Sequence, residues 1–172
     1  MSTLGSRRLL LRMFRESDLD AYAAMCGDAE VMRYLGAGYP LTREESWRNM
    51  ALVLGHWQLR GFGLWAVEER ATGLLAGRVG CWQPEGWPGR EIGWAFRREF
   101  WGRGYATEAA QLVIADTFSQ PENKRLISLI HPQNERSVAV ALRLGMRREQ
   151  GTEIMGHPAS LYSISRPRNP VA

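Results

Sequence analysis

Several features are scarce in this 172-residue chain, and each scarcity excludes a class of protein. Cys26 and Cys81 are the only cysteines, and they lie far apart with no Cys-x-x-Cys pair, which excludes a disulfide framework and a cysteine-based metal site. Three isolated histidines predict no metal site either. The apolar run at residues 9–11 ends at Arg12 and is far too short to span a bilayer, and residues 1–6 do not resemble a signal peptide. We therefore expect a cytoplasmic protein that does not enter a membrane.

Lysine is also scarce, since Lys124 is the only one among 22 basic residues, and the formal net charge is +4. Arginine suits planar, two-pronged contacts with phosphate, although a compositional bias of the genome explains the excess equally well. The basic residues are scattered along the chain rather than gathered in a block. This distribution predicts no direct binding of nucleic acid.

What the chain does contain is typical of one globular domain. The hydrophobic fraction is 45% and the charged fraction 23%, both ordinary values, and the length fits a single domain. No repeat, linker or low-complexity tract divides the sequence. We therefore expect one domain over residues 1–172, with residues 166–172 as a flexible tail.

Periodicity and turn residues predict an α/β (α+β) fold in which a mixed sheet has helices on both faces. About seven strands are expected, at residues 8–14, 63–69, 74–82, 90–96, 125–130, 146–155 and 160–165. Helices are expected at residues 18–25, 30–35, 44–60, 105–118 and 134–144. Ser17 is the expected N-cap of the first helix, and Thr42 with Glu45 forms the capping box of the third.

The most informative segment joins a predicted strand to a predicted helix at residues 101–107. Gly102 and Gly104 leave the main chain bare where the helix begins, and Ala106 and Thr107 are small. Free N–H groups and the positive end of the helix dipole then face one point, which favours a phosphate. A Gly-x-Gly pair alone is more often a tight turn, but the flanking strand and helix favour binding. No Gly-Lys-Ser/Thr follows, and the preceding strands form a meander, so neither a Walker loop nor a dinucleotide fold is expected.

Three blocks carry a resemblance to a known family: Glu-Ile-Gly-Trp at residues 91–94, Trp-Gly-Arg-Gly-Tyr-Ala-Thr-Glu-Ala at 101–109, and Asn-Glu-Arg-Ser to Leu-Gly-Met at 134–146. In this combination the chain resembles the GNAT N-acetyltransferases, and within them the Rim-type branch of ribosomal-protein-alanine N-acetyltransferases. The order of elements from Arg8 to Ser165 matches as well. Trp101 stands where the broad family has Gln or Arg, in agreement with the Rim-type branch. The resemblance implies a GNAT-like, mostly antiparallel sheet.

The same resemblance implies an acetyl-CoA-dependent enzyme without a metal, in which main-chain groups hold coenzyme A. The pyrophosphate is expected on the N–H groups of Gly102, Arg103, Gly104, Tyr105, Ala106 and Thr107. The pantetheine arm is expected to pair, strand-like, with Trp94, Ala95, Phe96 and Arg97. A strand edge can bind an amide-containing arm through main-chain hydrogen bonds.

Asn134 and Ser137 open the last predicted helix, and by sequence alone they are an N-cap and an ordinary first-turn serine. In the family, the matching asparagine bonds the cofactor arm and the matching serine lies near the sulfur. The resemblance therefore implies that both contact the cofactor. Capping and binding are compatible, because an amide has several hydrogen-bonding atoms.

The implied reaction is direct attack of a neutral primary amine on the thioester of acetyl-CoA. Glu91 is the favoured general base, because Gly93 and Ala95 on its face of the strand leave room for a substrate; a solvated strand-end carboxylate is an equal alternative. Glu153, His157 and Tyr162 are weaker candidates. A strand N–H near Trp94 or Ala95 would stabilise the oxyanion.

Ser137 is favoured on the thiol side of the reaction. Many family members have a tyrosine after the asparagine helix, where this chain has Leu142 and Leu144. No covalent enzyme intermediate is required, so the absence of a nucleophile constellation is no objection.

The acceptor is the least determined part of this interpretation. In such folds residues 26–61 and 150–160 shape the acceptor pocket, with Trp47 and Trp87 at its border. A protein N-terminal α-amine is expected from the branch, and a small-molecule amine (antibiotic, polyamine or amino acid) is nearly as well supported. A non-catalytic acyl-CoA sensor and an unrelated nucleotide-binding protein are the alternatives from other classes. A monomer and a homodimer are both compatible with the sequence.

Overall fold

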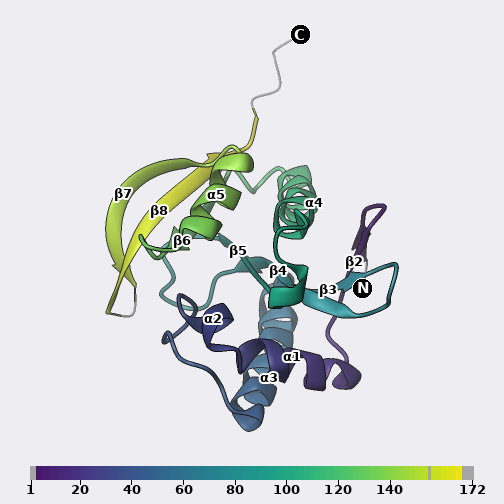
Figure 1. Ribbon diagram of the computed structural model, residues 1–172. Coiled ribbons are helices and arrows are strands. Elements are labelled where there is room, and N and C mark those ends of the chain that lie inside the picture. Colours follow the sequence, from purple (N-terminus) through teal and green to yellow (C-terminus); the bar gives the residue numbers. More distant parts are fainter. Residues whose placement is uncertain (1–2, 155, 168–172) are drawn as a thin grey trace.

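One mixed sheet organises the molecule (Figure 1). The computed structural model describes residues 3–154 and 156–167. In these residues eight strands follow the order β1-β2-β3-β4-β5-β6-β8-β7. Only β5 and β6 are parallel neighbours in that described sheet; the other pairs are antiparallel. The expected mixed, mostly antiparallel sheet is therefore confirmed, with one strand more than predicted.

The elements follow the predicted order closely. The strands are β1 Leu4–Gly5, β2 Leu9–Arg12, β3 Leu64–Glu69, β4 Leu75–Trp82, β5 Glu91–Phe96, β6 Arg125–Ile130, β7 Arg147–Ile154 and β8 His157–Ser165. The helices are α1 Leu19–Cys26, α2 Ala29–Met32, α3 Arg43–Arg60, α4 Tyr105–Ser119 and α5 Glu135–Arg143, with short 3-10 turns at Glu16–Asp18 and Arg98–Phe100.

The helix caps show one correct prediction and one error. Thr42 and Glu45 exchange the two hydrogen bonds of a capping box at the start of α3, which ends at Gly61 in the left-handed conformation. Ser17 is not the N-cap of α1, because it lies inside the 3-10 turn that precedes the helix. Asp18 organises this corner instead: its carboxylate accepts the N–H of Arg15 at 2.8 Å.

The sheet separates two apolar cores, one on each face. On the α4–α5 face, Ala109 and Ala141 pack against Leu126 and Ile92. On the α1–α3 face, apolar side chains of α1, α2 and α3 pack against Leu64, Ala66 and Ala95. Figure 1 shows α1, α2 and α3 on one side of the sheet and α4 and α5 on the other. Alternate residues of a strand therefore belong to different cores, as the pleat requires.

The sheet splits at its centre, between β5 and β6. These strands pair only at Glu91 and Ile127, where the N–H of Ile127 donates to the carbonyl of Arg90 at 3.0 Å. The carbonyl of Arg90 points toward β6. Main-chain groups alternate in direction along a strand, so those of the even-numbered residues of β5 also point toward β6. Beyond Glu91, this edge of β5 has no strand partner in the described residues.

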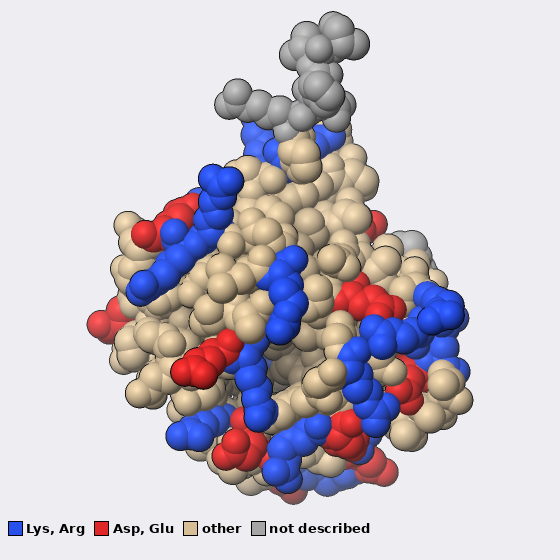
Figure 2. Space-filling view, turned by 45° about the horizontal axis from the view of Figure 1, so that its top comes forward, with Lys and Arg blue, Asp and Glu red and all other residues tan. Residues whose placement is uncertain are grey.

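The charged side chains on the surface are mixed, as their scattered positions in the sequence predict. On the face shown in Figure 2, acidic side chains stand among the basic ones. The N–H of Arg166 donates to the carbonyl of Lys124 at 2.9 Å, while residues 168–172 of the expected tail lie outside the described residues. Among the described helices, none combines the length and the hydropathy that crossing a membrane would require.

Candidate active site

The glycine loop, residues 102–107, forms a cup of main-chain N–H groups at the start of α4. Gly102 and Gly104 have φ values of 75° and 77°, a left-handed conformation that favours glycine. Gly104 is the N-cap of α4 and supplies no capping side chain. Within the described part of the chain, none of the six N–H groups from Gly102 to Thr107 has a hydrogen-bond acceptor. Together with the helix dipole they suit a diphosphate.

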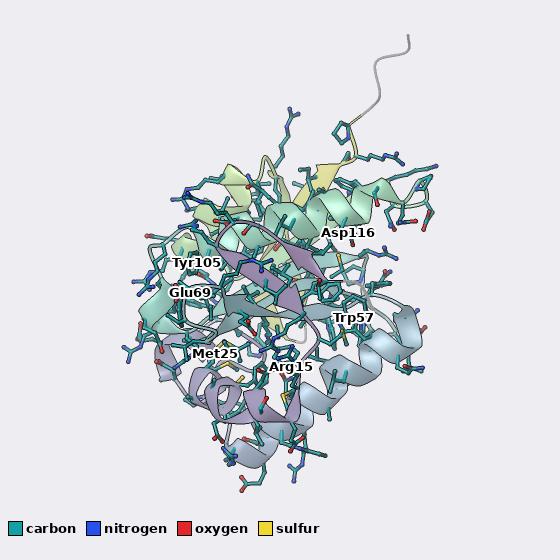
Figure 3. All side chains as sticks on the ribbon, turned by 90° about the vertical axis from the view of Figure 1, so that its right-hand side faces the viewer. Arg15, Met25, Trp57, Glu69, Tyr105 and Asp116 are labelled. Atoms are coloured by element: carbon teal, nitrogen blue, oxygen red, sulfur yellow. The ribbon has the colours of Figure 1, made fainter. Side chains whose placement is uncertain are left out.

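Side chains of this loop are tied down away from the cup. The carboxylate of Glu69 accepts hydrogen bonds from the hydroxyl of Tyr105 at 2.5 Å and from Arg103 at 3.1 Å. The bond from Tyr105 is the main cause that lowers the pKa of Glu69. Figure 3 shows Tyr105 and Glu69 side by side at the start of α4. The hydroxyl of Tyr105 and the Nη1 of Arg103 are therefore engaged by Glu69, while both residues keep their main-chain N–H groups free.

A second carboxylate, Glu108, holds the N-terminal segment against the loop. It accepts hydrogen bonds from Ser6 and from Arg8, whose guanidinium also donates to the carbonyl of Arg103 at 3.0 Å. Glu108 thus links the N-terminal segment to the first turn of α4. These contacts fix the shape of the loop before any ligand binds.

The free edge of β5 offers main-chain groups at Trp94. The N–H of Arg97 donates to the carbonyl of Ala76 at 2.9 Å, and Ala95 pairs with Arg78 on the same side, so both residues use their main chain on β4. The carbonyl of Phe96 faces the split but accepts the indole N–H of Trp101 at 2.7 Å. Of the four residues expected to pair with pantetheine, Trp94 is the one whose main-chain N–H and carbonyl both face the split without a partner in the described residues.

Trp101 connects the loop to α5. Its indole N–H donates to the carbonyl of Phe96, and the guanidinium of Arg136 lies 4.3 Å from the centre of its ring. Such a stacked cation stabilises the contact by roughly 0.5–1 kcal/mol at an exposed site. The first turn of α5 is thereby held beside the start of α4.

Asn134 caps α5, as the simpler interpretation of the sequence predicts. Its side-chain oxygen accepts the N–H of Ser137 at 3.2 Å. Within the described residues, the amide nitrogen of Asn134 and the hydroxyl of Ser137 make no side-chain hydrogen bond. Both groups therefore remain available to a ligand.

Glu91 lies at the point where β5 and β6 part. Its carboxylate accepts the indole N–H of Trp87 at 2.8 Å and the main-chain N–H of Leu129, on β6, at 3.2 Å. Desolvation by burial raises the pKa of Glu91 to about 7, against the opposing effect of these two donors. A carboxyl with this pKa exchanges protons near neutral pH, which suits a general base.

Space for a substrate adjoins Glu91. A Cβ built at Gly93 would meet no heavy atom within 4 Å, and Gly93 lies two residues from Glu91 on the same face of β5. The stacked rings of Tyr34 and His131, 4.8 Å apart, join the segment after α2 to the end of β6. Trp87 contacts the site through Glu91, whereas Trp47 is an exposed residue of α3.

The weaker base candidates lie elsewhere. Glu153 and His157 are exposed on the β7–β8 hairpin, and Tyr162 is buried in β8. Tyr162 and Leu142 help to line a hollow of about 300 Å³ between α5 and the β7–β8 edge. Neither Glu91 nor Ser137 lines this hollow.

Comparison with known proteins assigns the family. Residues 8–147 match the acetyltransferase (GNAT) domain model. The uncharacterized N-acetyltransferase YnaD of Bacillus subtilis (strain 168) is 31% identical over 146 residues, 85% of this chain and 83% of that protein. The chain therefore belongs to the GNAT acetyltransferases, and it is an N-acetyltransferase that uses acetyl-CoA as cosubstrate.

Solved structures agree with this assignment. The acetyltransferase from Agrobacterium tumefaciens str. C58 superposes with a TM-score of 0.83 at 28% identity, covering 95% of this chain and 94% of its own. RimL, a ribosomal L7/L12 α-N-protein acetyltransferase solved with coenzyme A, superposes with a TM-score of 0.79 at 20% identity, covering 95% and 98%. The second likeness shows the fold alone.

Proposed function

We propose that this enzyme acetylates a primary amine by direct attack, and that its acceptor is a protein N-terminal α-amine. The observation that carries the proposal is the open space over Gly93, next to a carboxylate with a pKa of about 7 and beside the free edge of β5. These features supply room for the acceptor substrate, a carboxylate that can take its proton, and a main-chain edge for the cofactor arm, all at one place.

Each residue then has a defined task. The N–H groups of residues 102–107 bind the diphosphate of acetyl-CoA, and Asn134 with the main chain of Trp94 orients the pantetheine arm. Glu91 takes the proton of the amine as the new N–C bond forms and the C–S bond breaks. The Trp94 N–H faces the charge that develops on the carbonyl oxygen, and Ser137 donates a hydrogen bond to the departing sulfur.

The pKa of Glu91 supports an α-amine rather than a lysine side chain. An α-amine has an ordinary pKa near 8, whereas that of lysine is about 10.4. Near neutral pH a useful fraction of α-amines is already neutral, and a base with a pKa of about 7 is matched to the remaining proton transfer. The Rim-type resemblance points to the same class of acceptor.

The first test measures cofactor binding through the loop. Acetyl-CoA should raise the melting temperature of the wild type, because it binds the folded state, and Gly104→Val should remove this shift. Gly61→Val is the matched control: Gly61 has a similar φ of 73° and open space around a Cβ, so it reports the cost of strain alone. A normal shift in Gly104→Val would refute the loop assignment.

The second test identifies the acceptor by release of the CoA thiol. Peptides with a free α-amine should release thiol faster than N-blocked peptides whose only amine is lysine, and faster than polyamines or aminoglycosides. Binding of acetyl-CoA without thiol release from any amine would instead indicate a non-catalytic acyl-CoA sensor. Preference for a small-molecule amine would keep the reaction and overturn the proposed acceptor.

A further inference from the structure

Two arginines stand in one cross-strand row on the α1–α3 face, and only one of them has counter-charges. The row runs Arg12, Ala66, Arg78, Ala95 over strands β2 to β5. Arg12 is buried and forms ion pairs with Asp18 and Glu68, at 2.7 Å each. This is the usual way in which a folded protein accommodates a buried cation.

Arg78 is partly buried in the same row but has neutral partners. Its Nη1 donates to the hydroxyl of Tyr22 at 2.5 Å and to the side-chain oxygen of Asn49 at 2.8 Å. Burial raises the pKa of Tyr22 to about 12, so this hydroxyl stays uncharged. Across the described residues, no carboxylate lies within 4 Å of the Arg78 guanidinium.

The rest of the guanidinium remains free to bind. Nε and Nη2 of Arg78 make no hydrogen bond within the described structure, yet no side-chain nitrogen there is both buried and unpartnered. Both nitrogens therefore reach solvent. Tyr22 and Asn49, which also bond each other at 2.6 Å, hold the group from one side and leave its other donors open.

Arg78 shares its face with the candidate acceptor space. It is the cross-strand neighbour of Ala95, and Ala95 is four residues from Glu91 on the same face, about 13 Å along the strand. Gly93, with its open space, lies between them. Allowing for the reach of the arginine side chain, an amine at Glu91 and an anion at Arg78 are separated by roughly 6–13 Å.

We propose that Arg78 binds a carboxylate of the acceptor. The preferred substrate then has a free N-terminal α-amine and an acidic side chain at about position 2 to 4. This inference rests on the proposed function and specifies its acceptor. The free, fork-shaped donors of arginine match a carboxylate, and a bound acceptor would supply the counter-charge that Arg78 lacks in the described residues.

The experiment uses C-terminally amidated peptides with a free α-amine and one aspartate at position 2, 3 or 4, each compared with its asparagine counterpart. The readout is kcat/KM from thiol release. Wild type should prefer aspartate over asparagine by about tenfold at the best position, as a charged hydrogen bond to a partly exposed group allows. Arg78→Met should abolish this preference, and Arg78→Lys should keep part of it.

Two controls separate the possible causes. Arg143→Met removes the same charge from α5, on the opposite face, and should leave the preference intact. Arg78→Met should fold, because Tyr22 and Asn49 retain their mutual hydrogen bond, and an unchanged acetyl-CoA thermal shift would verify this. Equal rates for the aspartate and asparagine peptides, or a preference that survives in Arg78→Met, would overturn the inference. Absence of thiol release from every amine would instead count against the proposed function.

Discussion

Replacing Glu91 by glutamine tests the proposed base most directly, because the side chain keeps its shape and loses its titration. With a pKa of about 7, roughly a tenth of Glu91 is ionised at pH 6 and roughly nine tenths at pH 8. The raised pKa means that the carboxyl is protonated, and inactive as a base, below neutral pH. A glutamate at the ordinary value of 4.5 would be ionised almost fully at both pH values.

The assay is kcat/KM for one α-amine peptide at saturating acetyl-CoA, from pH 6 to pH 8.5, for the wild type and Glu91→Gln. Dividing one profile by the other cancels the titration of the acceptor amine, which both enzymes share. The ratio should rise about tenfold between pH 6 and pH 8, and the wild type should be about 100-fold faster at pH 8. A ratio near unity, or one that is constant with pH, would refute the role of Glu91.

Two further substitutions test the acceptor space and the fold. Gly93→Val should lower kcat/KM for the peptide at least about tenfold while leaving the acetyl-CoA thermal shift intact, because its side chain would fill open space on the α1–α3 face; an unchanged kcat/KM would place the acceptor elsewhere. Asp18→Asn should lower the free energy of unfolding by about 3 kcal/mol, since it leaves the buried Arg12 with one ion pair, and urea denaturation measures the loss. A change below about 0.5 kcal/mol would show that Arg12 does not depend on Asp18.

Local patterns predicted most elements of the fold, because they depend on neighbouring residues. The strand at residues 125–130 agrees with β6 to the residue. The Thr42–Glu45 box begins α3 as expected, and α3 ends at Arg60, where the predicted helix ends. β1 was missed because it has only two residues and exists through its pairing with β2. β8 begins at His157, three residues earlier than predicted, because it pairs with β7 back to Ile154.

Some features of the candidate site depend on neighbouring residues and could be predicted from the sequence, whereas others depend on residues far away in the chain. The cup at residues 102–107 follows from two glycines and a helix start, so the sequence could reveal it. The raised pKa of Glu91 depends on burial by the surrounding packing, and one of its donors comes from β6. Arg78 was not predicted at all, because its partners lie 56 and 29 residues away in α1 and α3; a lone arginine among the small and apolar residues of its strand was the only signal.

On the proposed arrangement, β5 serves the two substrates with two alternating sets of residues. Its even-numbered residues turn main-chain groups to the split, where any side chain gives the same edge for the cofactor arm. Its odd-numbered residues turn side chains to the α1–α3 face, where Glu91 and the space over Gly93 meet the acceptor. Substitution on that face, including at Arg78, can therefore change the acceptor without changing the cofactor edge. If the proposed arrangement holds, the chain can keep acetyl-CoA as donor while its acceptor varies, and acceptor specificity depends on side chains of the α1–α3 face rather than on the loop.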